Sequence, residues 1–167
     1  MADDNKKILF ERIVEENKGI FFKIARTYCR NEDDRQDLLQ EMMIQVWRSL
    51  HKYNDEYKIS TWLYRICLNM AISFYRKHNS RVKNTDPLDE QVFNTQLNGD
   101  PVEAEDFVLL KQFIDELNDI DKALMLLYLE DRSHSEIAGV LGISKSNVGT
   151  RIGRIKEKLK KRFSKLY

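Results

Sequence analysis

Apolar residues recur at spacings of three and four through most of the chain, which is the period of an amphipathic helix. In the first half this pattern predicts a helix from Asp3 or Asp4 to about Arg30 and a second from about Asp34 to Leu50. A third is predicted over residues 61–77, behind a Ser60 cap. In the second half, residues 108–117 give an amphipathic helix and residues 123–129 a nearly all-apolar one. The pattern therefore predicts an all-α fold.

The periodicity stops between residues 79 and 102, where Pro87, Gly99 and Pro101 stand among Asn, Thr and Gln. Such a composition is typical of a linker. We therefore expect two small helical domains, residues 1–78 and 103–167, joined by a flexible segment over 79–102.

Residues 131–161 carry the signature of a helix-turn-helix. Ser133 and Glu136 have the spacing of a capping box, Gly142 stands where a left-handed C-cap ends a helix, and Ser144 can cap the next one. In that last helix the apolar positions form one buried face. The residues predicted to face outward are Lys145, Ser146, Asn147, Thr150, Arg151 and Arg154.

Charge is strongly segregated although the formal net charge is only +1. From residue 142 to 167 there are nine Lys or Arg and one acid. A basic helix on a helix-turn-helix suits the major groove and its flanking phosphates, so this helix is predicted to bind duplex DNA. A solvated basic face on an ordinary bundle is the alternative, and the turn and cap residues favour DNA.

The stretch between Tyr57 and Thr85 contains no acid and six Lys or Arg. Trp62, Tyr64 and Tyr75 interleave with these bases. Aromatic rings beside cations can hold unstacked nucleic-acid bases, although a single aromatic is more often a core residue. The combination predicts a second, single-stranded nucleic-acid site.

The second predicted helix has an unusual polar side. Acids in its first turn complement the helix dipole, which accounts for Asp33 and Asp34. It does not account for Asp37, Gln40 and Glu41. From residue 84 to 110 there are seven further acids and no Lys or Arg.

Other classes of site find little support. No apolar run approaches the roughly 20 residues needed to span a bilayer, and no signal peptide precedes the first helix, so we expect a cytoplasmic protein. Cys29 and Cys67 have apolar neighbours and are predicted to be buried, reduced thiols. The three histidines lie at no metal-ligand spacing, so we predict no metal and no cofactor.

The order of motifs resembles the extracytoplasmic-function (ECF) sigma factors of bacterial RNA polymerase. DDRQDLLQEMMIQVWRSLHKY is similar to the polymerase-binding helix of that family, STWLYRICLNMAISFYRK to its promoter-melting segment, and EIAGVLGISKSNVGTRIGRIKEKLKK to its minus-35 reader. The resemblance implies an alternative sigma factor that binds core RNA polymerase and promoter DNA and has an anti-sigma factor as a partner. It also implies that the acidic linker threads polymerase channels made for nucleic acid.

The resemblance also implies roles for particular residues. The polymerase-docking positions are Asp37, Leu38, Gln40, Glu41 and Trp47. The positions that hold the melted minus-10 element are Tyr53, Trp62, Tyr64, Arg65 and Asn69, to which the basic stretch adds Arg76 and Lys77. The outward residues of the last helix are expected to read the minus-35 element as duplex, with Arg151 and Arg154 as the principal contacts.

Two departures from the family pattern affect the reader helix. It begins Ser146-Asn147-Val148, which is more polar than usual, and Gly149 and Gly153 replace basic or bulky residues. Two rival interpretations remain. A helix-turn-helix repressor or activator that recruits no polymerase would need a ligand-binding or dimerisation domain in the first half. A nucleic-acid enzyme would need a carboxylate cluster, metal ligands or an activated nucleophile, and the sequence has none at useful spacing.

Overall fold

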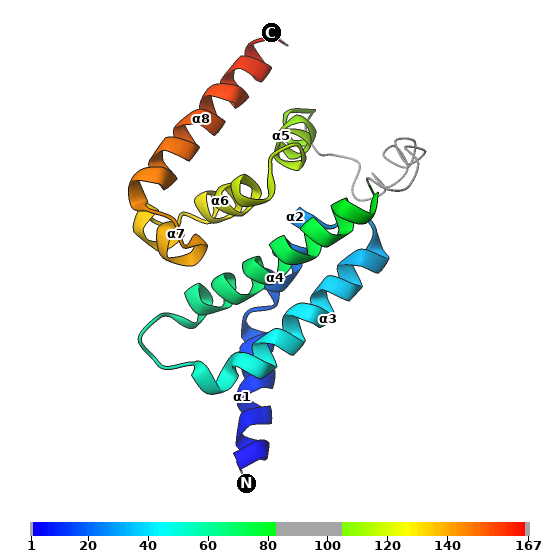
Figure 1. Cartoon of the computed structure of the whole chain (residues 1–167), viewed down its shortest axis with the longest axis vertical. Helices are drawn as coiled ribbons and strands as arrows, with labels where there is room; N and C mark the ends of the chain where they lie inside the picture. The colour runs from blue at the N-terminus through cyan, green and yellow to red at the C-terminus, as the bar shows by residue number, and fades with distance from the viewer. Residues whose placement is uncertain (1, 83–104, 166–167) are drawn as a thin grey trace.

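The computed structural model describes residues 2–82 and 105–165, and all regular elements in those ranges are helical (Figure 1). This confirms the all-α prediction. The elements are α1 (Ala2–Glu16), α2 (Lys18–Tyr28), α3 (Glu32–Ser49), the short 3-10 turn η1 (Leu50–Lys52), α4 (Ile59–Val82), α5 (Glu105–Asp115), α6 (Asp119–Leu129), α7 (His134–Leu141) and α8 (Lys145–Ser164). Most of the predicted linker, residues 83–102, lies outside the described residues.

The prediction of a single helix up to about Arg30 is wrong, because the helix is interrupted at Asn17. The Asn17 side chain donates to the Ile13 carbonyl at 2.9 Å, and the Asn17 backbone carbonyl then accepts from the Ile20 amide at 3.1 Å. A short polar side chain that bonds to the backbone competes with the helical ladder. Gly19, two residues further on, lowers helix propensity further. The result is two helices, α1 and α2, in place of the single predicted one.

The N-terminal domain is built on α2, α3 and α4. Helix α3 begins at Glu32, earlier than predicted, because Asn31 caps it by accepting a hydrogen bond from the Asp34 amide at 2.7 Å. Helix α4 begins at Ile59, before the predicted Ser60 cap, and runs past the predicted end at residue 77 to Val82. The helix therefore continues past residue 78, where the sequence predicts the first domain to end.

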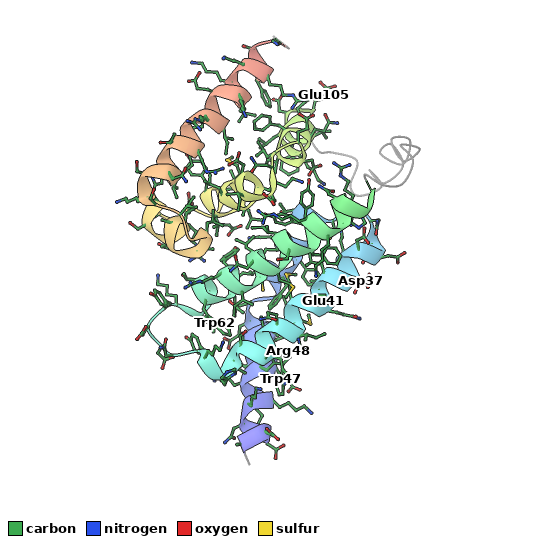
Figure 2. The ribbon with its side chains drawn as sticks, in the orientation of Figure 1. Asp37, Glu41, Trp47, Arg48, Trp62 and Glu105 are labelled. Carbon is green, nitrogen blue, oxygen red and sulfur yellow. The ribbon has the colours of Figure 1, made fainter. Side chains whose placement is uncertain are left out.

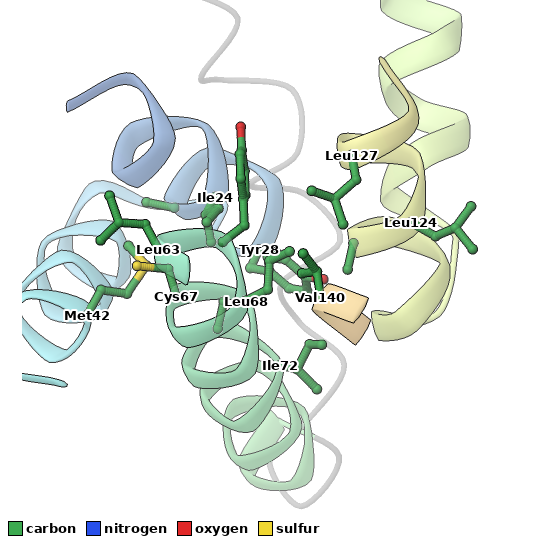
Figure 3. Packing of buried hydrophobic residues seen from close by; sticks show 14 of the residues in the cluster. Ile24, Tyr28, Met42, Leu63, Cys67, Leu68, Ile72, Leu124, Leu127 and Val140 are labelled. Carbon is green, nitrogen blue, oxygen red and sulfur yellow. The ribbon is translucent and has the colours of Figure 1, made fainter. Parts of the chain in front are cut away.

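The core of this domain lies between the three helices (Figure 3). Met42 of α3 faces Leu63 and Cys67 of α4, and Ile24 of α2 closes the same layer. Met42, Leu63, Cys67 and Ile24 are each 0% exposed. At roughly 1.5 to 3 kcal/mol per fully buried apolar side chain, this layer is a large part of the domain's stability.

The C-terminal domain is organised around α6, as the apolar run at residues 123–129 predicts. Ala123, Leu124 and Leu127 are each 0% exposed, and α6 contacts α5, α7 and α8. Its end does not follow the prediction, since Leu129 is 56% exposed. A nearly all-apolar helix is stable in water only where neighbours cover most of its surface.

The helix-turn-helix forms as its cap residues predict. The Glu136 amide donates to Ser133 Oγ at 3.1 Å to start α7, and the Asn147 amide donates to Ser144 Oγ at 3.0 Å to start α8. Between them Gly142 ends α7 with a φ of +69°, a left-handed conformation that glycine adopts without steric penalty. The two serine caps and the left-handed glycine are confirmed. In the predicted capping box the Ser133 half is present, whereas the Glu136 carboxylate accepts from the Ser133 hydroxyl at 3.3 Å.

The two domains pack against each other along α4. Helix α4 contacts both α6 and α7, and its Leu68 and Ile72 belong with Leu127 and Val140 to one cluster of buried residues that spans both domains (Figure 3). The Tyr28 hydroxyl of α2 donates to the Asp119 carbonyl at the start of α6, at 2.7 Å. The helix-turn-helix therefore rests on the N-terminal domain.

Among the described residues, none of the helices is long and apolar enough to cross a bilayer.

Candidate nucleic-acid interface

One face of α4 brings together most of the residues predicted to hold melted DNA. Trp62, Arg65, Asn69 and Arg76 follow one another at helical spacing. Arg65 and Asn69 are exposed and Trp62 is partly exposed. Tyr53, which precedes the helix, places its ring centroid 5.1 Å from that of Trp62, with a tilt of 53° between the planes. The result is a partly exposed aromatic pair beside an arginine and an amide.

The loop between η1 and α4 adds an aromatic residue that the sequence did not single out. Tyr57 is 59% exposed, and its carbonyl accepts a hydrogen bond from the Tyr53 hydroxyl at 3.5 Å. An exposed tyrosine next to Lys58 has the chemistry of a base-stacking position. The available signal was its place at the edge of the acid-free stretch.

Tyr64 does not lie on this face. Its side chain is 2% exposed and points toward the C-terminal domain, where the Arg132 guanidinium carbon lies 5.3 Å from the centre of the ring. Burial raises the pKa of the Tyr64 hydroxyl to about 12. In this arrangement Tyr64 is part of the packing between the domains and presents no surface to a base.

The two basic residues predicted to bind DNA near the end of α4 have different surroundings. Arg76 forms an ion pair with Asp119 of α6, and that hydrogen-bonded contact raises the pKa of the Arg76 guanidinium. Lys77 is exposed. Of the two DNA-binding residues predicted here, one is therefore engaged by a carboxylate of the other domain.

On α8 the predicted outward positions are confirmed for five of the six residues. Lys145, Ser146, Asn147, Thr150 and Arg154 are all exposed, while Val148, Ile152 and Ile155 are buried. Arg151 differs, because its Nη1 donates to Asp121 Oδ1 of α6 at 3.0 Å and its Nε donates to Asn147 Oδ1 at 3.2 Å. It is held against the domain instead of projecting freely.

The predicted polymerase-docking residues lie along α3 (Figure 2). Asp37, Gln40 and Glu41 are exposed, and Ile44, one turn further on, is 44% exposed. Within residues 2–79 and 105–165, neither Asp37 nor Glu41 forms an ion pair. We call Asp37, Gln40, Glu41 and Ile44 the α3 acidic face.

The other two docking residues are less accessible. Leu38 is 0% exposed and belongs to the core, so it supports α3 from inside. Trp47 is partly buried under α1, where the Phe10 ring packs edge-on with centroids 5.3 Å apart and Lys6 Nζ lies 4.2 Å from the ring centre. Only part of Trp47 is available to a partner.

The two cysteines are buried and free, as predicted. Burial raises the pKa of both the Cys29 and the Cys67 thiol to about 12, so both stay protonated near neutral pH. Across the described parts of the chain, no group of three or more His, Cys, Asp or Glu side chains is arranged to hold a metal ion.

Two different family models match the two halves of the chain. The family model of sigma-70 region 2 matches residues 13–81, and that of sigma-70 region 4 matches residues 107–159. The chain is 31% identical to the RNA polymerase sigma factor SigZ of Bacillus subtilis (strain 168), over 84% of this chain and 81% of the relative. It is 28% identical to the ECF RNA polymerase sigma factor SigM of the same organism, over 83% and 85% respectively.

Two solved structures have a similar fold. CnrH in complex with the cytosolic domain of CnrY has a TM-score of 0.66 at 22% identity, covering 95% of this chain and 89% of that one. The sigma factor RpoE in complex with the anti-sigma factor NepR from Bartonella quintana has a TM-score of 0.68 at 17% identity, covering 98% of each chain.

Proposed function

Because the chain belongs to the extracytoplasmic-function sigma factors of RNA polymerase, we propose a specific division of labour between its two domains. The protein is an alternative sigma factor that directs RNA polymerase to initiate at promoters. The N-terminal domain, which α4 extends to Val82, binds core polymerase and the melted minus-10 element. The C-terminal domain, from Glu105 onward, binds the minus-35 element as duplex.

The observation that carries this proposal is the contrast between the exposed surfaces of α4 and α8. Tyr53 and Trp62 offer two ring faces next to Arg65 and Asn69, which suits an unstacked base and its edge. Flipping a base out of a duplex costs a few kcal/mol, which stacking on such a pair can offset. We assign Tyr57 and Lys77 to the same surface.

Helix α8 has the features of a major-groove reader. It follows the capped turn, its apolar side is buried, and its exposed side carries short polar residues and one projecting arginine, Arg154. The side chains assigned to DNA are Lys145, Ser146, Asn147, Thr150 and Arg154. Arg151 we assign to positioning α8, because Asp121 already engages it.

The α3 acidic face is the proposed contact with core polymerase. This face is negatively charged, so it is repelled by DNA. The same charge is complementary to a basic surface on a partner protein. Ile44 supplies apolar area at the end of the acidic row, and part of Trp47 extends it. Interfaces of this kind gain specificity from the charges and burial energy from the apolar residues.

We further propose that an anti-sigma factor binds this chain and that both act in the cytoplasm with the polymerase. Support comes from the fold neighbours, one in complex with the cytosolic domain of CnrY and the other with the anti-sigma factor NepR. Family membership supports a DNA-binding regulator whose polymerase carries out the chemistry.

The test is reconstitution with core RNA polymerase from the same host. The full chain should co-migrate with core enzyme in a native gel and should allow it to start transcription at discrete positions on genomic fragments. Mapping those starts also gives the promoter sequence that assays of variants need. A chain that bound duplex DNA tightly alone and did not associate with core polymerase would overturn the proposal.

A further inference from the structure

The first turn of α6 carries two carboxylates that each engage an arginine assigned to DNA by the sequence. Asp119 forms an ion pair with Arg76 of the N-terminal domain, and Asp121 forms one with Arg151 of α8, the proposed DNA-recognition helix. The two aspartates are largely covered, with side chains 16% and 13% exposed. A carboxylate, like a DNA phosphate, is an anion that accepts charge-assisted hydrogen bonds from a guanidinium, so the two can compete for one arginine.

The Asp119 contact is part of a longer seam between the domains. The Tyr28 hydroxyl bonds to the Asp119 carbonyl at 2.7 Å, and Lys23 of α2 pairs with Glu130 at the end of α6, at 2.5 Å. Near the middle, Lys122 is 3% exposed, with its Nζ 4.4 Å from the centre of the Tyr75 ring. The seam therefore combines apolar packing with many charged and polar groups, which is typical of interfaces that open and close.

The closed seam covers one candidate DNA residue of α4, Tyr64, and pairs a second, Arg76, with a carboxylate. Arg132, just after α6, lies over the Tyr64 ring and seals it from solvent. At the other end an open cleft of about 540 Å³ lies beside the Arg76 pair and is lined by Tyr75, Arg76, Asn79 and residues 116–119. Because this end is open and Arg76 keeps 63% of its side-chain surface, an anion from outside can reach the guanidinium and compete for it.

We propose that Asp119 acts as an internal substitute for a DNA phosphate, so that the closed form of this chain is autoinhibited. In the closed form the Asp119 carboxylate is ion-paired with Arg76, and Arg132 in the turn after α6 covers the Tyr64 ring. Trp62, Arg65 and Asn69 stay accessible in the closed form, but binding of a single strand along the whole of α4 requires Arg76 to exchange the carboxylate for a phosphate and the domains to separate. The two events are thermodynamically linked, so whatever opens the seam raises DNA affinity, and DNA opens the seam. This inference rests on the proposed role of α4 in DNA binding.

The experiment measures seam opening and DNA binding separately in the full chain. Because Cys29 and Cys67 are buried, dyes can be placed on the variants Glu11→Cys in α1 and Lys158→Cys in α8, which are exposed positions outside the seam. Energy transfer between the dyes reports opening. DNA binding is measured by fluorescence anisotropy with a random-sequence single strand of about 20 nucleotides, since stacking and phosphate binding are tolerant of sequence.

Two variants open the seam without touching a DNA group. Asp119→Asn removes the charge but keeps a side-chain oxygen. That oxygen can still accept a hydrogen bond from the Ile120 amide, as Asp119 Oδ1 does at 2.8 Å. Tyr28→Phe removes only the hydroxyl that bonds to the Asp119 carbonyl. The matched control is Glu116→Gln, which removes one negative charge three residues from Asp119 but breaks an ion pair with Arg162 inside the C-terminal domain.

We expect Asp119→Asn and Tyr28→Phe to lower energy transfer and to tighten single-strand binding by about threefold to tenfold, while Glu116→Gln changes neither. Equal tightening in Glu116→Gln would mean that net charge alone is responsible and would overturn the proposal. Lower energy transfer without tighter binding would show that closure does not block DNA. Unchanged energy transfer in both seam variants would also reject it. None of these outcomes depends on polymerase, so failure here is distinct from failure of reconstitution.

Discussion

Arg151 Nη1 donates a hydrogen bond to Asp121 Oδ1 at 3.0 Å, which fastens the recognition helix α8 to the first turn of α6. The Asp121 amide in turn donates to Asn118 Oδ1, the cap of α6, at 2.9 Å. The orientation of α8 is therefore fixed by a polar chain as well as by Val148 and Ile152 in the core. An arginine that the sequence identifies as a principal DNA contact has a structural task in this fold.

Arg151 and Arg154 should consequently respond differently to replacement by Ala. Arg151→Ala leaves the largely covered Asp121 carboxylate without its partner, so we expect the free energy of unfolding to fall by about 1 kcal/mol. Arg154→Ala, at an exposed position, should leave stability unchanged and weaken promoter binding by about 1 to 3 kcal/mol, or about 5- to 150-fold. Urea unfolding and promoter binding by the reconstituted holoenzyme measure the two effects. Equal loss of stability in both variants would contradict this assignment.

Reversal of charge on the α3 acidic face should weaken polymerase binding selectively. We expect the double variant Asp37→Lys and Glu41→Lys to bind core polymerase at least about tenfold more weakly, because like charges brought together at an interface cost several kcal/mol. Folding should be unaffected, since both side chains are exposed. Glu11→Lys on α1 is the control, and competition native gels are the measurement. The idea fails if the control loses as much polymerase binding as the double variant.

Trp62 should matter for promoter melting through its flat ring. Trp62→Leu keeps apolar bulk but removes the stacking face, and we expect it to destabilise the open complex by about 1 to 3 kcal/mol per stacked base. Trp62→Phe keeps a ring that can pack on Tyr53 and should retain most of the activity. Permanganate footprinting of unpaired thymines measures melting. Similar defects in Leu and Phe would indicate that Trp62 acts only as a packing residue.

Two glycines of the helix-turn-helix should respond to Ala with opposite signs. Gly142 has a φ of +69°, so Gly142→Ala should lower the free energy of unfolding by about 1 to 2 kcal/mol. Gly153 lies inside α8, and no neighbouring element comes within 4 Å of the position that an alanine Cβ would take, so Gly153→Ala should raise it by up to about 1 kcal/mol. Thermal or urea unfolding of the full chain checks both. A stabilising Gly142→Ala would show that the turn does not need the left-handed conformation.

The buried thiol of Cys67 should make stability fall at alkaline pH. Its pKa is raised from 9.0 to about 12 by burial, so between these values the unfolded chain loses a proton that the folded chain keeps. The thiol's contribution is fully present below pH 9 and is lost as the pH rises toward 12. From pH 8 to pH 10 we expect a loss of about 1.4 kcal/mol from this group.

Urea unfolding of the native chain and of Cys67→Ala at the two pH values isolates this contribution. The variant should lose less stability than the native chain over the interval, by about the same 1.4 kcal/mol. Identical losses would mean that the thiol is not protected by burial. Tyr64, whose pKa is also raised to about 12, acts in the same direction but begins to contribute nearer pH 10.

Sequence by itself determined the features that depend on a few neighbouring residues. Ser133, Gly142 and Ser144 set the limits of the two helices of the helix-turn-helix, because a cap acts within one turn of the backbone. The spacing of apolar residues likewise determined which side of α8 is buried. The break at Asn17 was the local feature missed, since an apolar stripe continues across it. Only the non-helical backbone angles of Asn17 and its side-chain bond to the Ile13 carbonyl mark the interruption.

Tertiary structure alone decided which of the candidate side chains are available. Arg76 and Asp119 are 43 positions apart, and Lys23 and Glu130 are 107 apart, so no local pattern signals either pair. Tyr64 and Leu38 carry side chains that suit a partner surface, but packing against Arg132 and the α3–α4 core places both in the interior. Burial is a property of the assembled chain, because it depends on which elements come to cover a residue and not on the residue itself.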